Sequence, residues 1–170
     1  MPTTERARQE RSLYSRLIVF EDDLRQAAYF AKHLLKKGWH YDPWDAKIRW
    51  PTYMQQAAFT TALVTAYCRP FSGANGYPTL SMKLAPYDSP QRALHSKLRS
   101  LRNSVYAHSE VQQQNVRPVS NLGRATAMVS QPVMKLSREE VEMILDMTHI
   151  TSQAIREKLQ SLIERVESET

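Results

Sequence analysis

The sequence predicts an all-α protein, an up-and-down four-helix bundle with a short β-hairpin or extended insertion before the last helix. Apolar residues recur at steps of three and four, the period of an amphipathic helix, over four segments: about 12–37, 51–69, 89–108 and 137–168. Residues 111–136 lose this period and mix valines with serine, threonine, glutamine and proline, which is typical of extended structure. No regular alternation of strands and helices appears, which argues against a Rossmann-type fold.

The first expected helix has an apolar face at regular steps: Leu13, Leu17, Phe20, Leu24, Ala27, Ala31 and Leu34. Gly38 follows the last periodic residue, where a left-handed residue ends many helices. The next segment, residues 39–50, holds all three tryptophans. Such a segment either caps the end of the bundle, which we favour, or offers a stacking surface for bases.

The other three helices have recognisable start signals. Pro51 suits the first turn of the second helix, where its missing N–H has no consequence. Ser89 is the expected N-cap of the third helix. Ser137 and Glu140 have the spacing of a capping box that opens the last helix.

Length and composition fit one domain, residues 1–170, with an insertion at about 111–136. The single cysteine, Cys68, excludes a disulfide framework and a cysteine-based zinc site. No cluster has the spacing of metal ligands, so neither a metal nor a cofactor is expected. No segment is apolar and long enough for a bilayer, and no secretory signal is visible. The sequence therefore predicts a cytoplasmic protein that has no membrane partner.

Positive charge is concentrated in the middle of the chain. The net charge is +6, from 23 basic and 17 acidic residues. Residues 46–109 contain a single acid, Asp88, among eight basic residues, whereas residues 137–170 contain eight acids and four basic residues. A basic segment favours anionic partners such as RNA, DNA or nucleotides. The alternative is an ordinary solvated surface that the acidic last helix partly neutralises.

The third helix carries the densest group of chemically active side chains. Four of them follow at steps of four, three and four and are expected to share one face: His95, Arg99, Arg102 and Tyr106. His108 continues the neighbouring apolar stripe. We therefore expect His108 to point inward or into an interface near the end of the helix.

The segment Arg102-Asn103-Ser104-Val105-Tyr106-Ala107-His108-Ser109 resembles the HEPN superfamily (higher eukaryotes and prokaryotes nucleotide-binding). Many members are ribonucleases with an arginine, a polar residue, a short spacer and a histidine at the end of a bundle helix. The resemblance covers about fifteen residues and is greatest for small abortive-infection and toxin-type members. It implies a homodimer in which two such motifs meet.

The chemistry of metal-free RNA cleavage fits these residue types. Histidine titrates near neutrality and serves as base or acid, which is the role expected of His108. The guanidinium of Arg102 offers a fork of donors that matches phosphate oxygens. Asn103 would orient the histidine or hold a phosphate oxygen. Four residues would line the approach of the RNA backbone: His95, Lys97, Arg99 and Tyr106.

The resemblance thus predicts an endoribonuclease of toxin–antitoxin or phage-defence type, with RNA as substrate and an antitoxin or another protein as a further partner. We expect the homodimer interface to include the second half of the third helix. The alternatives are a catalytically inactive HEPN-type module that binds nucleotide, RNA or protein, and a purely structural bundle. In those cases His108 is a buried structural histidine, and Arg102 pairs with an acid of the last helix such as Glu139 or Glu142.

Overall fold

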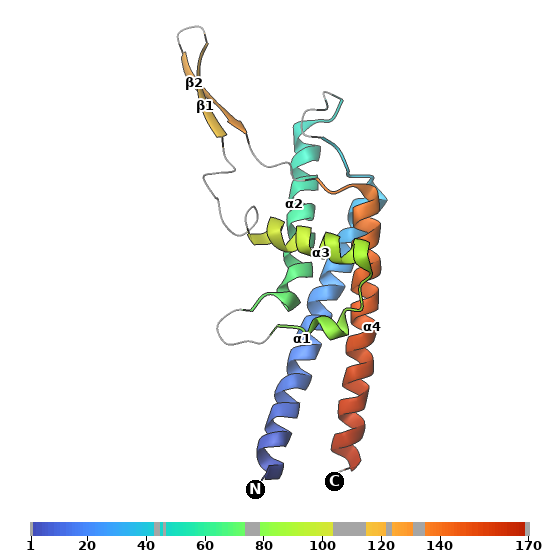
Figure 1. Cartoon of the computed structure of the whole chain (residues 1–170). Helices are drawn as coiled ribbons and strands as arrows, with labels where there is room; N and C mark the ends of the chain where they lie inside the picture. Colours follow the sequence, from blue (N-terminus) through green and yellow to red (C-terminus); the bar gives the residue numbers. More distant parts are fainter. Residues whose placement is uncertain are drawn as a thin grey trace.

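The computed structural model describes residues 2–42, 45, 47–73, 79–103, 115–121, 124–130 and 135–168 (Figure 1). The described residues form four α-helices: α1 (Pro2–Lys37), α2 (Trp50–Cys68), α3 (Ser89–Leu101) and α4 (Arg138–Ser168). Two short 3₁₀ turns, η1 (Arg69–Phe71) and η2 (Met82–Leu84), lie between α2 and α3. Strands β1 (Asn115–Asn121) and β2 (Arg124–Ser130) pair antiparallel and lie to one side of the helices. The predicted helical bundle is therefore confirmed.

The bundle is built on α1, which packs against α4 on one side and α2 on the other. Both α2 and α4 run antiparallel to α1, and the ends of the chain lie at the same end of the molecule (Figure 1). At about 1.5 Å per residue, α1 is about 54 Å long and α2 only about 28 Å. Beyond the end of α2, α1 and α4 therefore continue as a pair of helices. The buried core contains the predicted apolar face of α1 from Leu17 to Leu34.

Helix α3 does not run along the bundle as an up-and-down topology requires, but lies across the other helices (Figure 1). The connection before it accounts for this. Leu80 is buried, and its backbone N–H donates to the carbonyl oxygen of Pro70 in η1 at 2.7 Å. The chain then passes through η2, which contacts α4, to the buried Tyr87. Helix α3 thus starts beside α4 and returns across the bundle towards α2.

The ends of the helices follow local chemistry. Gly38 has a φ of 64° and ends α1, as predicted. The capping box between Ser137 and Glu140 is also confirmed, with hydrogen bonds of 3.0 and 3.2 Å. Two expectations were wrong: α1 begins ten residues before residue 12, and the N-cap of α3 is Asp88 rather than Ser89.

The side chain of Asp88 accepts the backbone N–H of Gln91 at 2.8 Å, and the side chain of Gln91 accepts the backbone N–H of Asp88 at 3.1 Å. Asp88 competes successfully with Ser89 because an aspartate oxygen is an equally good N-cap acceptor and Gln91 lies three residues after it. Within the part of the chain that the structure describes, no helix combines the length and the apolar character that crossing a membrane requires.

Candidate functional site

Helix α3 is fastened to the bundle at its start and along its middle. Arg92 donates to the backbone carbonyl of Tyr87, just before the helix. Leu94 and Leu98 are buried in the common core. The end of α3 is thereby held in place, and the side chains there are presented by a supported helix.

Arg102 and Asn103 follow α3 in a π-helical turn. A guanidinium nitrogen of Arg102, Nη1, donates to the side-chain oxygen Oδ1 of Asn103 at 3.0 Å. Arg102 is half-buried and Asn103 is exposed. This bond orients the guanidinium and leaves several of its N–H donors for another acceptor. The other two candidate site residues of this segment, Tyr106 and His108, lie outside the described residues.

Arg99 and Arg102 form no ion pair with any carboxylate of the described residues. The expected structural partners of Arg102 are engaged elsewhere. Glu142 pairs with Arg138 at 2.9 Å, and hydrogen bonds from Ser137 and from its own backbone lower the pKa of Glu139. The alternative that either acid neutralises Arg102 is therefore wrong.

Cys68 lies close to this end of α3 and is buried. Burial raises the pKa of the thiol to about 12, although the charges of Arg102 and Arg99 act in the opposite direction. A thiolate is the reactive form of cysteine. Cys68 is thus an unreactive neighbour of the two arginines.

Lys97 differs from the two arginines because it has an acidic partner. Its ammonium forms an ion pair with Oε1 of Glu140, and Oε2 of the same carboxylate accepts the backbone N–H of Ser137 at 3.0 Å. Glu140 therefore joins α3 to the first turn of α4. The charge of Lys97 is partly neutralised, so Lys97 is a weaker candidate for phosphate binding than the arginines.

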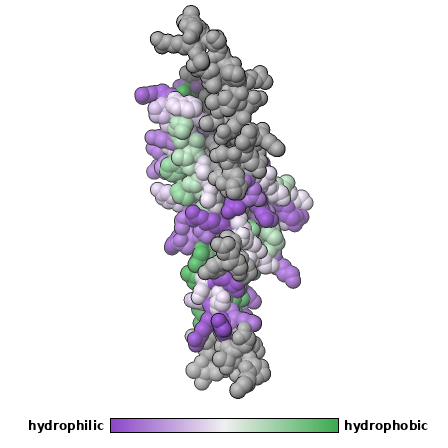
Figure 2. Space-filling view, turned by 90° about the vertical axis from the view of Figure 1, so that its left-hand side faces the viewer, coloured by the Kyte–Doolittle hydropathy of each residue, from purple (hydrophilic) through white to green (hydrophobic). Residues whose placement is uncertain are grey.

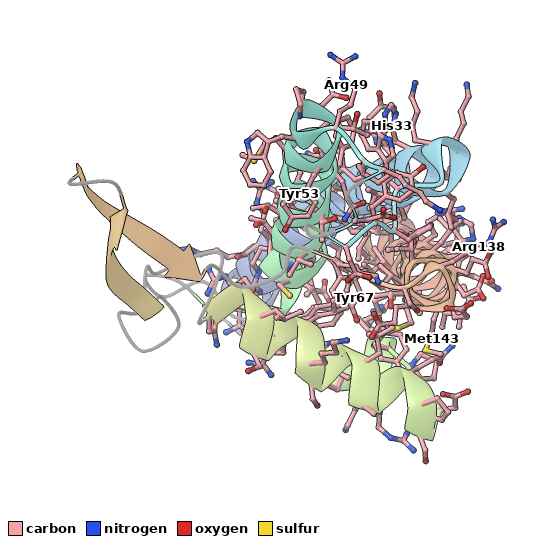
Figure 3. All side chains as sticks on the ribbon, turned by 90° about the horizontal axis from the view of Figure 1, so that it is seen from above. His33, Arg49, Tyr53, Tyr67, Arg138 and Met143 are labelled. Atoms are coloured by element: carbon pink, nitrogen blue, oxygen red, sulfur yellow. The ribbon has the colours of Figure 1, made fainter. Side chains whose placement is uncertain are left out.

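His95 lies in the interior and not on the expected phosphate-binding face. Only 5% of the residue is exposed. Its ring packs edge-on against Phe71 with 4.7 Å between ring centroids. Its Nδ1 lies 2.9 Å from the hydroxyl of Tyr67, which Figure 3 shows pointing into the space between α2, α3 and α4. In this position His95 cannot line the approach of an RNA backbone.

His95 ends a buried chain of hydrogen bonds. Thr151 donates to the carbonyl of Met147 at 2.9 Å, so Tyr87 donates to Thr151 at 2.7 Å. Tyr67 donates to Tyr87 at 3.4 Å. Tyr67 also shares a shorter hydrogen bond, of 2.9 Å, with Nδ1 of His95.

The other ring nitrogen of His95, Nε2, is buried and has no partner in the part of the chain that the structure describes. Burial, and secondarily the charge of Arg99, lowers the pKa of His95 from its ordinary value of 6.5. His95 is therefore a neutral structural residue that connects α3 to α2 and, through Tyr87, to α4.

The first part of the aromatic segment after α1 caps the bundle, as we favoured for the whole segment. The ring of Trp39 packs edge-on against Phe59 at 5.7 Å. His40 contacts the carbonyl of Leu136, before α4, through Nδ1 at 3.1 Å. Trp39 is thus a packing residue and not a platform for bases; Trp44 lies outside the described residues.

The structure therefore brings Arg99, Arg102 and Asn103 together at the end of α3 and buries His95 on the inner side of that helix. Comparisons with protein-family models, with curated proteins and with solved structures give no match. Within the described ranges, no group of three or more histidine, cysteine or acidic side chains is placed to hold a metal ion. The arginine pair at the end of α3 is the feature from which a function is argued.

Proposed function

We propose that this protein is a HEPN-like, metal-independent endoribonuclease of toxin–antitoxin or phage-defence type. The observation that carries the proposal is the pair Arg99 and Arg102, free of carboxylates among the described residues and supported by Asn103 at 3.0 Å from Arg102. Elsewhere on α3, Arg92 and Lys97 are engaged in holding the fold. Guanidinium groups without an acidic partner are suited to phosphate.

In the proposed reaction, Arg102 binds the non-bridging oxygens of the phosphate that is cleaved. The proton of the ribose 2′-hydroxyl passes to a base, the role proposed for His108. The 2′-oxygen forms a bond to phosphorus while the bond to the 5′-oxygen breaks, and an acid returns a proton to that oxygen. The products are a 2′,3′-cyclic phosphate and a 5′-hydroxyl. A homodimer would supply a second histidine as the acid.

A second candidate function is a catalytically inactive HEPN-type module that binds RNA, a nucleotide or a protein. Arg99 and Arg102, which form no ion pair with a carboxylate in the described part of the chain, support it equally, because binding phosphate requires these arginines but no base. The two candidates differ in whether His108 acts on the 2′-hydroxyl. Cleavage, and not affinity, therefore distinguishes them.

The decisive experiment is an RNA cleavage assay in EDTA with the wild type, Arg102→Ala and His108→Ala. We expect the wild type to cleave RNA without added metal, to leave cyclic phosphate ends and to spare DNA of the same sequence. Both variants should lose cleavage. RNA affinity should fall with rising salt, because phosphate binding releases counterions, and Arg102→Ala should reduce that dependence.

Arg25→Ala is the matched control, since it removes an exposed arginine that pairs with Asp22 on α1. Its cleavage should equal that of the wild type. Activity that needs a metal, or that survives His108→Ala, would reject the ribonuclease assignment. RNA binding that depends on Arg102 without any cleavage would establish the inactive module instead.

A further inference from the structure

The second half of α1 is basic. From residue 24 to residue 41 the chain has four basic residues and no acid, because the acids of α1 all precede this stretch. Lys36 and Lys37 lie in the last turn of α1, where they complement the negative end of the helix dipole. That effect fades within one turn, so it does not account for Lys32.

Three exposed side chains of this stretch share one face of α1. Tyr29, Lys32 and Lys36 follow at steps of three and four, and each is exposed. We call these three residues the α1 stripe. Neither lysine forms an ion pair with a carboxylate of the described residues. Arg25, one turn before Tyr29, differs because it pairs with Asp22.

The ring of Tyr29 is supported by other rings and is still exposed. Its centroid lies 5.6 Å from that of Phe30 and 6.4 Å from that of His33. His33 in turn stacks on Phe59 of α2 at 4.2 Å, with 13° between the two planes. Tyr29 nevertheless exposes 61% of its surface. A planar group could therefore stack on this ring at little cost in side-chain entropy.

A further cation lies on the same side of the bundle. Figure 3 shows His33 and Arg49 on one side, with α3 on the opposite side. Arg49 is exposed and forms no ion pair within the described ranges. In the loop before it, the charge of Asp42 is neutralised by Lys135 at 2.9 Å. In Figure 2 this side forms the left-hand edge, where hydrophilic residues project beside a column of hydrophobic ones.

We propose that the α1 stripe and Arg49 form a binding surface for single-stranded nucleic acid. The two lysines and Arg49 contact phosphates, and a base stacks on Tyr29, a combination that binds single strands with little regard to sequence. The charge selects a polyanion, and the supported, exposed ring selects one with planar groups. Because this surface and α3 lie on opposite sides of the bundle, the proposal does not depend on the ribonuclease proposal.

An anionic membrane fits this surface less well. A helix that lies in a membrane interface inserts an apolar face. The apolar face of α1 from Leu17 to Leu34 is already buried in the core. Within residues 24–37, all of which the structure describes, Tyr29 is the one large hydrophobic residue that is exposed. An acidic protein would satisfy the lysines but would gain nothing from Tyr29.

The test is fluorescence anisotropy of a labelled oligouridylate with full-length Arg102→Ala, in which the proposed catalytic arginine is removed so that binding is measured without cleavage. In that background, replacing both Lys32 and Lys36 by alanine should weaken binding. It should also reduce the slope of log affinity against log salt by about 1.4, since each phosphate contact with a single strand contributes about 0.7. Tyr29→Ala should weaken binding about fivefold or more with an unchanged slope, and Tyr29→Phe should not.

Matched controls exist for both residue types. Lys83→Ala removes a lysine of η2 that is exposed and likewise forms no ion pair with a described carboxylate. Tyr14→Ala removes a tyrosine that is 38% exposed on the same helix, about 22 Å from Tyr29 along the axis. Both controls should bind RNA like the background protein, and far-UV circular dichroism checks that each variant is folded.

Three results would overturn the proposal. The first is RNA affinity that the double lysine variant leaves unchanged. The second is a loss in that variant without any loss in Tyr29→Ala, which would indicate a purely electrostatic surface. The third is equal affinity for polyglutamate or for phosphatidylserine vesicles. Since Arg102 is absent from the background, binding by the α1 stripe and cleavage by the wild type can fail separately.

Discussion

Acid should destabilise the fold through His95. The folded state holds this ring neutral, with a pKa below its ordinary value of 6.5, because the ring is buried and Arg99 lies close to it. In the unfolded chain the ring binds a proton as the pH falls through 6.5. The unfolded state then binds more protons than the folded state, so the free energy of unfolding decreases as the pH falls. Above about pH 7.5 the ring is neutral in both states and contributes no pH dependence.

The size of the effect follows from linkage. One proton taken up on unfolding gives a slope of at most about 1.4 kcal/mol per pH unit, between 6.5 and the lowered pKa. His95→Asn removes the titration, and the asparagine amide can donate or accept a hydrogen bond near the position of Nδ1. At pH 7.5 it should cost about 1 to 3 kcal/mol, from two lost edge-on ring contacts, to Phe71 and Tyr67.

The assay is urea unfolding of the wild type and His95→Asn at several pH values from 8 to 5. The difference between the free energies of unfolding of the two proteins removes the contribution of the other histidines and leaves that of His95. We expect the free energy of unfolding of the wild type to exceed that of His95→Asn by less and less as the pH falls below 6.5. An advantage that stays constant over this range, or that grows in acid, would refute the buried neutral state of His95.

Three further predictions concern residues around the site. Cys68 should resist a thiol reagent at pH 8 in the folded protein and react promptly in urea, since burial raises its pKa to about 12. Gln56→Ala should lower the free energy of unfolding by about 2 to 4 kcal/mol in a urea titration, because the buried amide makes two hydrogen bonds to the backbone of Tyr41, at 2.7 and 2.9 Å. Glu140→Gln should cost only about 0.5 to 1 kcal/mol, as the ion pair is partly exposed, and should tighten RNA binding in a fluorescence titration because it releases Lys97.

The sequence predicts the helices well because their signals are local. The three-and-four spacing, the glycine at 38 and the capping box at 137–140 act within a few residues and need no knowledge of the rest of the chain. The direction of α3 is different. It depends on how the connection after α2 packs across the bundle, where the buried Leu80 is hydrogen-bonded to Pro70 and the buried Tyr87 to Thr151 of α4. No local pattern encodes that path.

The interior position of His95 follows from the same crossing. At about 100° per residue, His95 lies about 60° from Leu98 around α3, and Arg99 lies about 100° from it. A helix that contacts one neighbour buries a narrow stripe, which would leave His95 at its edge. Because α3 crosses several helices, the buried stripe is wider and includes His95, whereas Arg99 stays outside. The grouping of these two residues on one functional face was therefore wrong.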